Sequence, residues 1–474
     1  MHATSHAFKD NAHRALHDAP LQRALGNLRA GFPGKRAAAI ARLPEFEALR
    51  DAGRDLKNHV LENLDFYLET FETNVVRHGG FVHWARDAAE ANRIILDLCR
   101  KAGAKTVTKG KSMVSEETAL NAFLEANGVQ PVETDLGEYI LQLRQEHPSH
   151  IIAPAIHLNK EQVADAFHEH HQQYGLTRRL TEARELLNEA RQVLRAKFLA
   201  ADVGLTGANF LIAETGSSII VTNEGNGDLT QLLPRVHVVL AGIEKVVPTL
   251  EDATLMLRLL ARSATGQEFT VYNTFSSGPR RPEDPDGPEE YHVVLLDNGR
   301  SAMLGGEFQD MLRCIRCSAC MNHCPVYGAI GGHAFGWVYP GPMGMVLTPA
   351  LIGLEEARHL PNASTFCGRC ESVCPVRIPL PGLMRHWRER EYEQHLQPAA
   401  MRFGLRTWAF FARRPRLYRL LARLGARALK VMGGKDRRIR RLPLAGGWTA
   451  WRDMPAPQGR TFQEQWAARR PEKR

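Results

Sequence analysis

Between residues 61 and 300, segments with the hydrophobic pattern of a helix alternate with short apolar segments typical of strands. A stretch of helical character, ARDAAEANRIILDLCRKAG, precedes the β-rich run KTVTKG at 105–110. Further β-rich runs are HIIAPAIHL at 150–158, FLIAETGSSIIVTNEGN at 210–226, RVHVVLAGI at 235–243 and YHVVLLDNG at 291–299. Strands that alternate with helices predict an α/β sheet whose faces are covered by helices.

The segment before this region should be a helical arm. Residues 1–60 carry leucines close to helical spacing among polar residues, which predicts amphipathic helices. We expect a break at 31–34, where Gly, Phe, Pro and Gly follow one another, because proline and glycine disfavour helix interiors.

The chain from residue 386 onward is predicted to be an Arg-rich helical region. Residues 401–474 hold 20 Lys and Arg against 4 Asp and Glu, although the whole chain has a net charge of only +9. One predicted helix carries an apolar stripe flanked by arginines, and the stripe consists of Leu417, Leu420, Leu421, Leu424, Ala428 and Leu429. Docking on an acidic partner subunit is the favoured role. A packed helix with a solvated face, or peripheral contact with a membrane surface, is the alternative, and we expect no binding to nucleic acid.

Length and composition agree with a protein of about three or four parts. The chain has 474 residues, of which 44% are hydrophobic and 24% charged. The N-terminus lacks the apolar core of a secretory signal, so we expect a cytoplasmic location with reduced thiols. The expected parts are a helical arm at 1–60, an α/β domain at 61–300, a cysteine-rich domain at 301–385 and a basic helical region at 386–474.

Seven of the eight cysteines lie in two runs that together predict iron-sulfur clusters. The first run, CIRCSACMNHCP, has the spacing C-x2-C-x2-C-x3-C followed by proline, and the second, CGRCESVCP, repeats its latter half. This is the ferredoxin-type pattern for two 4Fe-4S clusters, in which the cysteine before the proline ligates the other cluster. The predicted ligands of the first cluster are Cys314, Cys317, Cys320 and Cys374. Those of the second are Cys324, Cys367 and Cys370. A structural zinc site, the alternative, needs cysteines in fours.

The second cluster lacks one cysteine ligand. A full repeat would place a cysteine at position 364, where the chain has Ser364. The fourth iron could be bound by the Ser364 oxygen, water, another side chain or a ligand from a partner, or it could be absent, which leaves a three-iron cluster. Cys99, the remaining cysteine, lies on an apolar helical stripe and is expected to be a core thiol.

The α/β region offers weaker candidates for a catalytic site. Lys111 lies in TKGKSMV, a glycine-containing turn after a predicted strand, which is a common place for anion binding. This turn matches neither an ATP loop nor a dinucleotide fingerprint. Glu214 follows another predicted strand and could act as an acid or base if it is buried. The alternative for both residues is an ordinary surface or turn position.

Four motifs in order along the chain resemble the lactate utilisation protein B family. From the N-terminal to the C-terminal side they are GANFLIAETGSSIIVTNEGN, CIRCSACMNHCPVYGAIGGHAFGWVYPGPMGMVLTP, STFCGRCESVCPVRIPL and WRDMPAPQGRTFQEQW. The resemblance implies an α/β lactate-utilisation domain similar to sugar-phosphate isomerases and CoA transferases, and an all-α ferredoxin-like domain with two 4Fe-4S clusters. It also implies two partner subunits, one cysteine-rich and one with a second lactate-utilisation domain. It assigns no catalytic residue.

These observations lead to one functional hypothesis and one alternative. The hypothesis is an iron-sulfur electron-transfer subunit of a complex that oxidises L-lactate to pyruvate, with the chemical step shared with the partners. The alternative is a redox-sensing or scaffold iron-sulfur protein whose basic tail binds a partner or nucleic acid.

Overall fold

The computed structural model describes residues 3–443, 445–450 and 452–469, so Trp451, at the start of the C-terminal motif, lies outside the described residues. The chain divides into two compact units, Met1–Glu391 and Tyr392–Arg474. Within the described residues, no helix has both the length and the apolar character needed to cross a bilayer.

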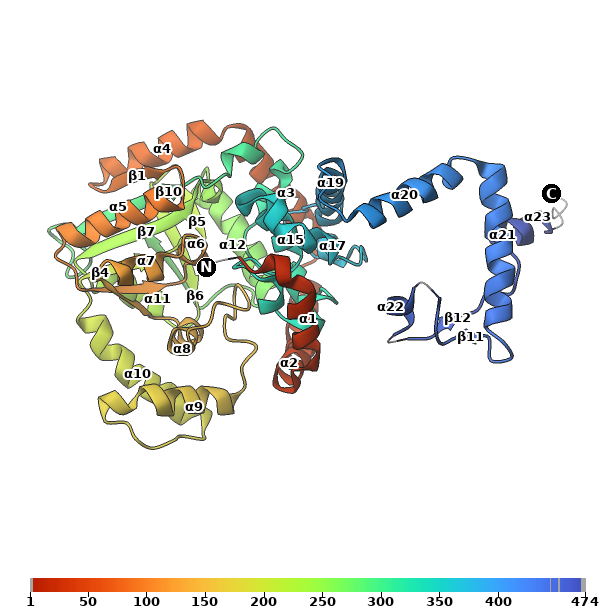
Figure 1. Cartoon of the computed structure of the whole chain (residues 1–474). Helices are drawn as coiled ribbons and strands as arrows, with labels where there is room; N and C mark the ends of the chain where they lie inside the picture. The colour runs from red at the N-terminus through yellow and green to blue at the C-terminus, as the bar shows by residue number, and fades with distance from the viewer. Residues whose placement is uncertain (1–2, 444, 451, 470–474) are drawn as a thin grey trace. The chain divides into compact units, whose positions relative to one another are not determined.

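A six-stranded parallel sheet forms the centre of the first unit (Figure 1). Its strand order is β1-β10-β7-β4-β2-β3, and every neighbouring pair is parallel. The strands are β1 (Phe81–Ala85), β2 (Thr106–Gly110), β3 (Gln130–Glu133), β4 (Val203–Thr206), β7 (Val236–Gly242) and β10 (Glu290–Leu296). From β2 the chain proceeds outward to β3, whereas from β4 it proceeds the other way to β7 and β10. The succession therefore reverses between β2 and β4, which is where open α/β sheets commonly bind ligands.

Helices cover both faces of this sheet. Since successive side chains of a strand point to opposite faces, each strand contributes to both apolar cores. On one face, Val238 and Leu240 of β7 pack with α5 (Ala88–Lys101) and α7 (Leu120–Ala126). On the other face, Val239 of β7 packs with α4 (Leu64–Arg77). This double coverage explains why β7 and β10 are almost continuously apolar.

A smaller sheet and a helical layer complete the α/β region. The second sheet has the order β8-β5-β6-β9 and pairs β5 with β6 in an antiparallel hairpin. Its strands are β5 (Phe210–Ile212), β6 (Ser217–Thr222), β8 (Val246–Val247) and β9 (Tyr272–Ser276). Helices α8 (Leu136–Arg144), α9 (Lys160–His170) and α10 (Ala183–Leu199) share a separate apolar core.

The cysteine region consists of short helices and turns. They include α13 (Ala319–Asn322), α14 (Tyr327–Ile330), α15 (Gly341–Ile352), α18 (Arg369–Ser372) and the start of α19 (Leu380–Glu393). The N-terminal helices α1 (Phe8–His17), α2 (Ala19–Ala41) and α3 (Phe46–Glu62) pack against this region and against α12 (Leu250–Ala264) (Figure 1). The predicted arm is therefore part of the first compact unit.

The second unit is built around two exposed helices, α20 (Ala399–Ala412) and α21 (Pro415–Met432). Neither helix buries a residue. Along the predicted apolar stripe of α21, Leu420 and Leu424 are each 52% exposed. A two-residue antiparallel pairing of β11 (Arg438–Ile439) with β12 (Met454–Pro455) and the short helix α23 (Phe462–Ala467) follow.

Two expectations about local structure are wrong. Residues 150–158 form turns instead of a strand, and the buried ring of His150 lies 2.9 Å from the amide oxygen of Asn322 in the cysteine region. The apolar side chains of this run thus pack between the α/β region and the cysteine region. Helix α2 continues through Pro33, because Leu28 and Ala39 are buried on either side of it.

Candidate functional site

The four cysteines predicted to hold the first cluster lie around one small cavity of about 20 Å³. They are Cys314, Cys317, Cys320 and Cys374. Between the first three, Arg316 and Ser318 have φ angles of 59° and 61°, so the loop curls tightly in a backbone conformation that favours glycine. The Sγ atom of Cys374 accepts a hydrogen bond from the backbone N–H of Ile378 at 3.3 Å. Backbone donors to cysteine sulfur tune the potential of iron-sulfur centres, so the chemistry of these four thiols and their N–H donor suits such a group.

The other three cysteines of the two runs form a second group. Burial, followed by the neighbouring charge of Cys324, raises the pKa of Cys370 to about 12. Cys367 also acts electrostatically on both Cys324 and Cys370. Cys370 is buried, Cys324 is half-buried and Cys367 is exposed. The structure therefore brings the predicted ligands of the second cluster together at the surface of the first unit.

Ser364 is close in sequence to this second group, but its side chain already has a partner. Its hydroxyl oxygen accepts a hydrogen bond of 3.1 Å from the backbone N–H of Phe366. Its backbone carbonyl accepts another from Arg388 at 3.1 Å.

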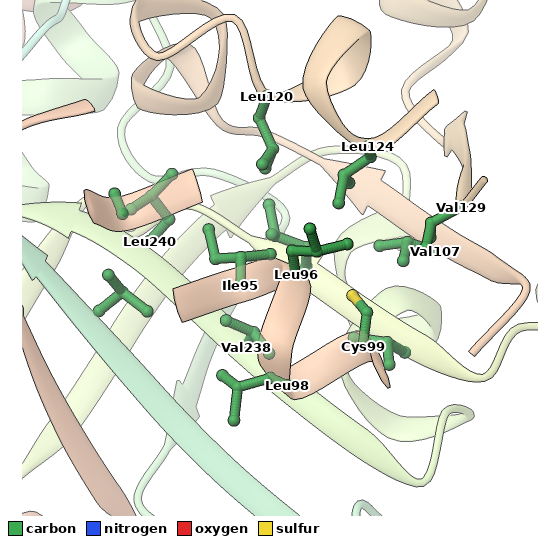
Figure 2. Close-up of a cluster of buried hydrophobic side chains, with 14 of the residues drawn as sticks. Ile95, Leu96, Leu98, Cys99, Val107, Leu120, Leu124, Val129, Val238 and Leu240 are labelled. Atoms are coloured by element: carbon green, nitrogen blue, oxygen red, sulfur yellow. The ribbon is translucent and has the colours of Figure 1, made fainter. Parts of the chain in front are cut away.

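Cys99 belongs to neither group of cysteines. It is fully buried among Ile95, Val107 and other apolar side chains of the α5 face (Figure 2). The expectation of a core thiol is confirmed.

Arginines from the N-terminal helices reach the cysteine loops. Arg36 in α2 donates a hydrogen bond of 2.9 Å to the carbonyl of Val373. Arg50 in α3 donates to the carbonyl of Cys374 at 2.7 Å. Both guanidinium groups are buried, with exposures of 8% and 4% for the two residues. Buried cations next to cysteines stabilise the thiolate form that binds iron, so these helices contribute to the site although sequence patterns gave no signal for them.

A second cavity of about 190 Å³ opens at the carboxyl ends of the central strands. Its charged lining residues are Lys111, Asp135, Glu138, Glu224, Lys245 and Arg316. Lys111 and Asp135 follow β2 and β3, and Lys245 lies in the turn after β7. Arg316 comes from the first cysteine run. The cavity therefore lies at the reversal of strand succession, and it adjoins the cysteine region.

Lys111 anchors one end of this cavity. Its ammonium group forms ion pairs with Asp135 and, at 3.2 Å, with Glu224. Burial disfavours the lysine charge, yet these two carboxylates raise the pKa of Lys111 above its ordinary value. For Glu138, burial and the neighbouring carboxylates of Glu133 and Asp135 raise the pKa well above the ordinary value. These surroundings thus favour the neutral form of Glu138 and the charged form of the nearby Lys111.

Glu214 does not belong to this cavity. It is exposed, and its carboxylate accepts a hydrogen bond of 3.3 Å from the backbone N–H of Leu250, the first residue of α12. Its position at a helix N-terminus is a structural role. The structure therefore separates the two residues that sequence analysis offered as catalytic candidates and keeps only Lys111 in a pocket.

A largely buried ion network joins the α/β region to the cysteine run. Arg300 donates two hydrogen bonds, of 2.9 and 2.8 Å, to Glu117 and a third of 2.8 Å to Glu244. Glu244 also accepts from Arg316 at 3.3 Å. Burial opposes the charge of Glu244, but Arg300 and Arg316 lower its pKa to about 2. The hydroxyl of Tyr339 donates a bond of 2.6 Å to Glu117.

Sequence reasoning missed Lys245 and Arg316. Burial and the neighbouring charge of Arg316 lower the pKa of Lys245 to about 8, so the two cations lie close together. The one available signal was the position of Arg316 between two predicted cluster ligands. Nothing in the sequence around Lys245 indicates that it enters a pocket.

Three family models match successive parts of the chain. Residues 68–296 match the LUD domain, 310–378 the 4Fe-4S dicluster domain and 386–471 the C-terminal domain of lactate utilisation protein B. The α/β region of the structure therefore corresponds to the LUD domain, and the cysteine region to the dicluster domain.

Proteins named lactate utilization protein B are similar over nearly their whole length. The one from Lysinibacillus sphaericus is 43% identical over 98% of this chain and 97% of its own, and the one from Bacillus subtilis is 42% identical over 98% and 96%. A crystal structure of a duf162 family protein from Deinococcus radiodurans is 17% identical and covers 49% of this chain and 98% of that chain. Its TM-score of 0.26 is too low to support an argument about the fold. From the sequence relatives and the three matching domains it follows that the chain belongs to the lactate utilisation protein B family.

Proposed function

We propose that this protein is the iron-sulfur electron-transfer subunit of a complex that oxidises L-lactate to pyruvate. The observation that carries the proposal is the cavity surrounded by four cysteines from two separate runs, together with the adjoining group of three. The lactate role rests on the names of the relatives.

The cysteines would hold two 4Fe-4S clusters, with the crossover that the sequence predicts. Cys314, Cys317, Cys320 and Cys374 would bind the first cluster, and Cys324, Cys367 and Cys370 three corners of the second. When bound, such clusters supply one-electron redox chemistry at potentials set by burial and hydrogen bonds to sulfur. The chain contributes the backbone donors at Ile378 and, at 3.5 Å from the Cys324 sulfur, Tyr327.

The chemical step of lactate oxidation would need further groups. It releases two electrons and two protons, one from the hydroxyl and one from the carbon that bears it. The sequence has no G-x-G-x-x-G fingerprint for a dinucleotide acceptor. Two one-electron centres in one chain suit a relay toward an acceptor. The partners would be a cysteine-rich subunit and a subunit with a second LUD domain, and the unburied apolar stripe of α21 supports a docking role for the second unit.

Lactate-dependent reduction of the clusters tests this function. The anaerobically purified chain is mixed with the two partner proteins and L-lactate, and cluster reduction is followed by electron paramagnetic resonance. The proposal predicts reduction that needs both lactate and partners. Clusters that stay oxidised in the complete mixture would contradict it and favour the redox-sensing or scaffold role.

A further inference from the structure

Two cations that line the LUD cavity keep donor groups that no described residue satisfies. Lys245 is 6% exposed, and the side chain of Arg316 is 10% exposed. Arg316 uses one nitrogen, Nη2, for Glu244, while Nη1 is buried without a hydrogen-bond acceptor among the described residues. Within the same described part of the chain, the Lys245 ammonium has no hydrogen bond and no ion pair at contact distance, although the charges of Glu244 and Cys314 favour its charged form. Buried charges are normally paired, so this end of the cavity is suited to an anion.

We propose that the cavity binds a small 2-hydroxy or 2-oxo monocarboxylate, whose carboxylate pairs with Lys245 and Arg316. Two donors from different elements match the two oxygens of a carboxylate, and bonds between charged partners are the stronger kind of hydrogen bond. The choice of a hydroxy or oxo acid rests on the proposed function, whereas the anion site rests on the geometry.

The opposite end of the cavity suits the second functional group of such a ligand. Lys111, Asp135 and Glu224 follow β2, β3 and β6, and β4 separates β2 from β7, whose turn carries Lys245. The carboxylates can accept a hydrogen bond from a hydroxyl, and the Lys111 ammonium can donate to an oxo group. At about 190 Å³ the cavity is smaller than the roughly 300–1,000 Å³ of pockets for drug-sized ligands. A ligand of a few heavy atoms fits this size.

The anion site adjoins the cavity of the first four cysteines. Ile151 and Arg316 line both cavities. An anion that pairs with Arg316 changes the charge next to Cys314, on which this guanidinium already acts electrostatically. Binding should therefore also change the spectrum of the first cluster, which is a readout independent of turnover.

The competing explanation is that the two cations only compensate the negative charge of the cluster and its cysteines. Calorimetric titration of the cluster-loaded full chain, without partners, separates the two. The probes are L-lactate, pyruvate and neutral lactamide, which keeps the hydroxyl but lacks the carboxylate. The variant is Lys245→Gln, and the matched control is Lys160→Gln, which removes an exposed lysine at the start of α9.

We expect saturable binding of lactate or pyruvate, at least tenfold weaker binding of lactamide and a similar loss in Lys245→Gln, with Lys160→Gln unchanged. Absence of saturable binding, equal binding of lactate and lactamide, or unchanged binding in Lys245→Gln would overturn the proposal. If Lys245→Gln does not fold, the comparison of lactate with lactamide on the unaltered protein decides. The proposed function can fail independently of this site. In that case the carboxylate binds, but the clusters stay oxidised when lactate and the partners are both present.

Discussion

Arg316, between two cysteines of the first run, donates a hydrogen bond of 3.3 Å to Glu244 in the turn after β7 of the LUD domain. The same carboxylate accepts a bond of 2.8 Å from the fully buried Arg300. The loop that carries the predicted ligands of the first cluster is thus held by the ion network at the carboxyl ends of the central sheet. The proposed electron relay and the proposed ligand pocket therefore share one structural support.

Arg300→Met should destabilise the first unit severely. The substitution removes the partner of two buried carboxylates, Glu117 and Glu244, and breaking a buried ion pair on one side typically costs about 3–5 kcal/mol. Urea unfolding measures the loss. The control Arg235→Met removes an arginine that is 49% exposed, and exposed pairs contribute about 0–1 kcal/mol. Equal losses in the two variants would contradict a network that supports the fold.

Glu138→Gln should remove a pH dependence of stability. Because the folded pKa of Glu138 is raised by burial and then by Glu133 and Asp135, its neutral form stabilises the fold fully below the unfolded pKa of about 4.3. That contribution is lost as the pH rises through the folded pKa. Glutamine resembles the neutral carboxyl and does not titrate. The variant should therefore gain thermal stability relative to the parent as the pH rises.

Melting temperatures measured from about pH 5 to about pH 9 check this expectation. Glu125→Gln serves as control, because Glu125 is an exposed carboxylate of α7. If Glu138→Gln and Glu125→Gln change with pH in the same way, the buried carboxyl is not the source of the effect.

Substitutions at Ser364 should show that its hydroxyl is not the missing ligand. Iron-sulfur clusters favour soft thiolate ligands over a hydroxyl, so Ser364→Ala should leave the iron content and the signal of the second cluster unchanged. Ser364→Cys restores the complete cysteine pattern and should slow the loss of iron in air. Iron and sulfide analysis measures both variants, and a three-iron signal in Ser364→Ala that the parent lacks would identify the hydroxyl as a ligand.

Cys99→Ala should keep all iron. The thiol is fully buried in the apolar core of the LUD domain (Figure 2), so its removal should cost on the order of 1 kcal/mol of stability through lost apolar contact. Cys370→Ala, in contrast, should lose the second cluster. Iron content per folded chain distinguishes the two, and a comparable loss from both variants would place Cys99 among the ligands.

Leu424→Asp should disrupt assembly with the two proposed partner subunits. Leu424 is 52% exposed on the apolar stripe of α21, where a charge opposes hydrophobic docking. Ala426→Asp adds the same charge on the other side of the helix and should have little effect. Co-purification with the two partners is the measurement. Binding of the unaltered chain to anionic vesicles, without binding to the partners, would indicate a membrane surface instead.

Local patterns in the sequence predicted those features that depend on neighbouring residues. The spacing of Cys314, Cys317 and Cys320 is set within one loop, and the alternation of helices with β-rich runs reflects burial of a parallel sheet. The same reasoning failed at 150–158, because an apolar run packs equally well as turns between two regions. It also failed at Pro33, where tertiary packing of α2 outweighs the local preference for a break.

The pocket could not be predicted because its charged residues come from distant parts of the chain. Lys245 and Arg316 meet only when the first cysteine run packs on the carboxyl end of β7. The arginines of α2 and α3 reach the cysteine loops for the same reason. Glu214 is a residue that the sequence favoured and the structure does not place in the pocket. It follows a predicted strand, but its carboxylate binds the N-terminus of α12 outside the pocket.

A redox titration of the anaerobically purified chain, followed by electron paramagnetic resonance, tests the central claim most directly. The account predicts two one-electron reductions within the range of about −700 to +450 mV that iron-sulfur clusters span. It also predicts that Cys370→Ala removes one of them and leaves the other. A chain with no reducible centre in that range, or with a single centre that survives in Cys370→Ala at full iron content, would contradict a two-cluster relay.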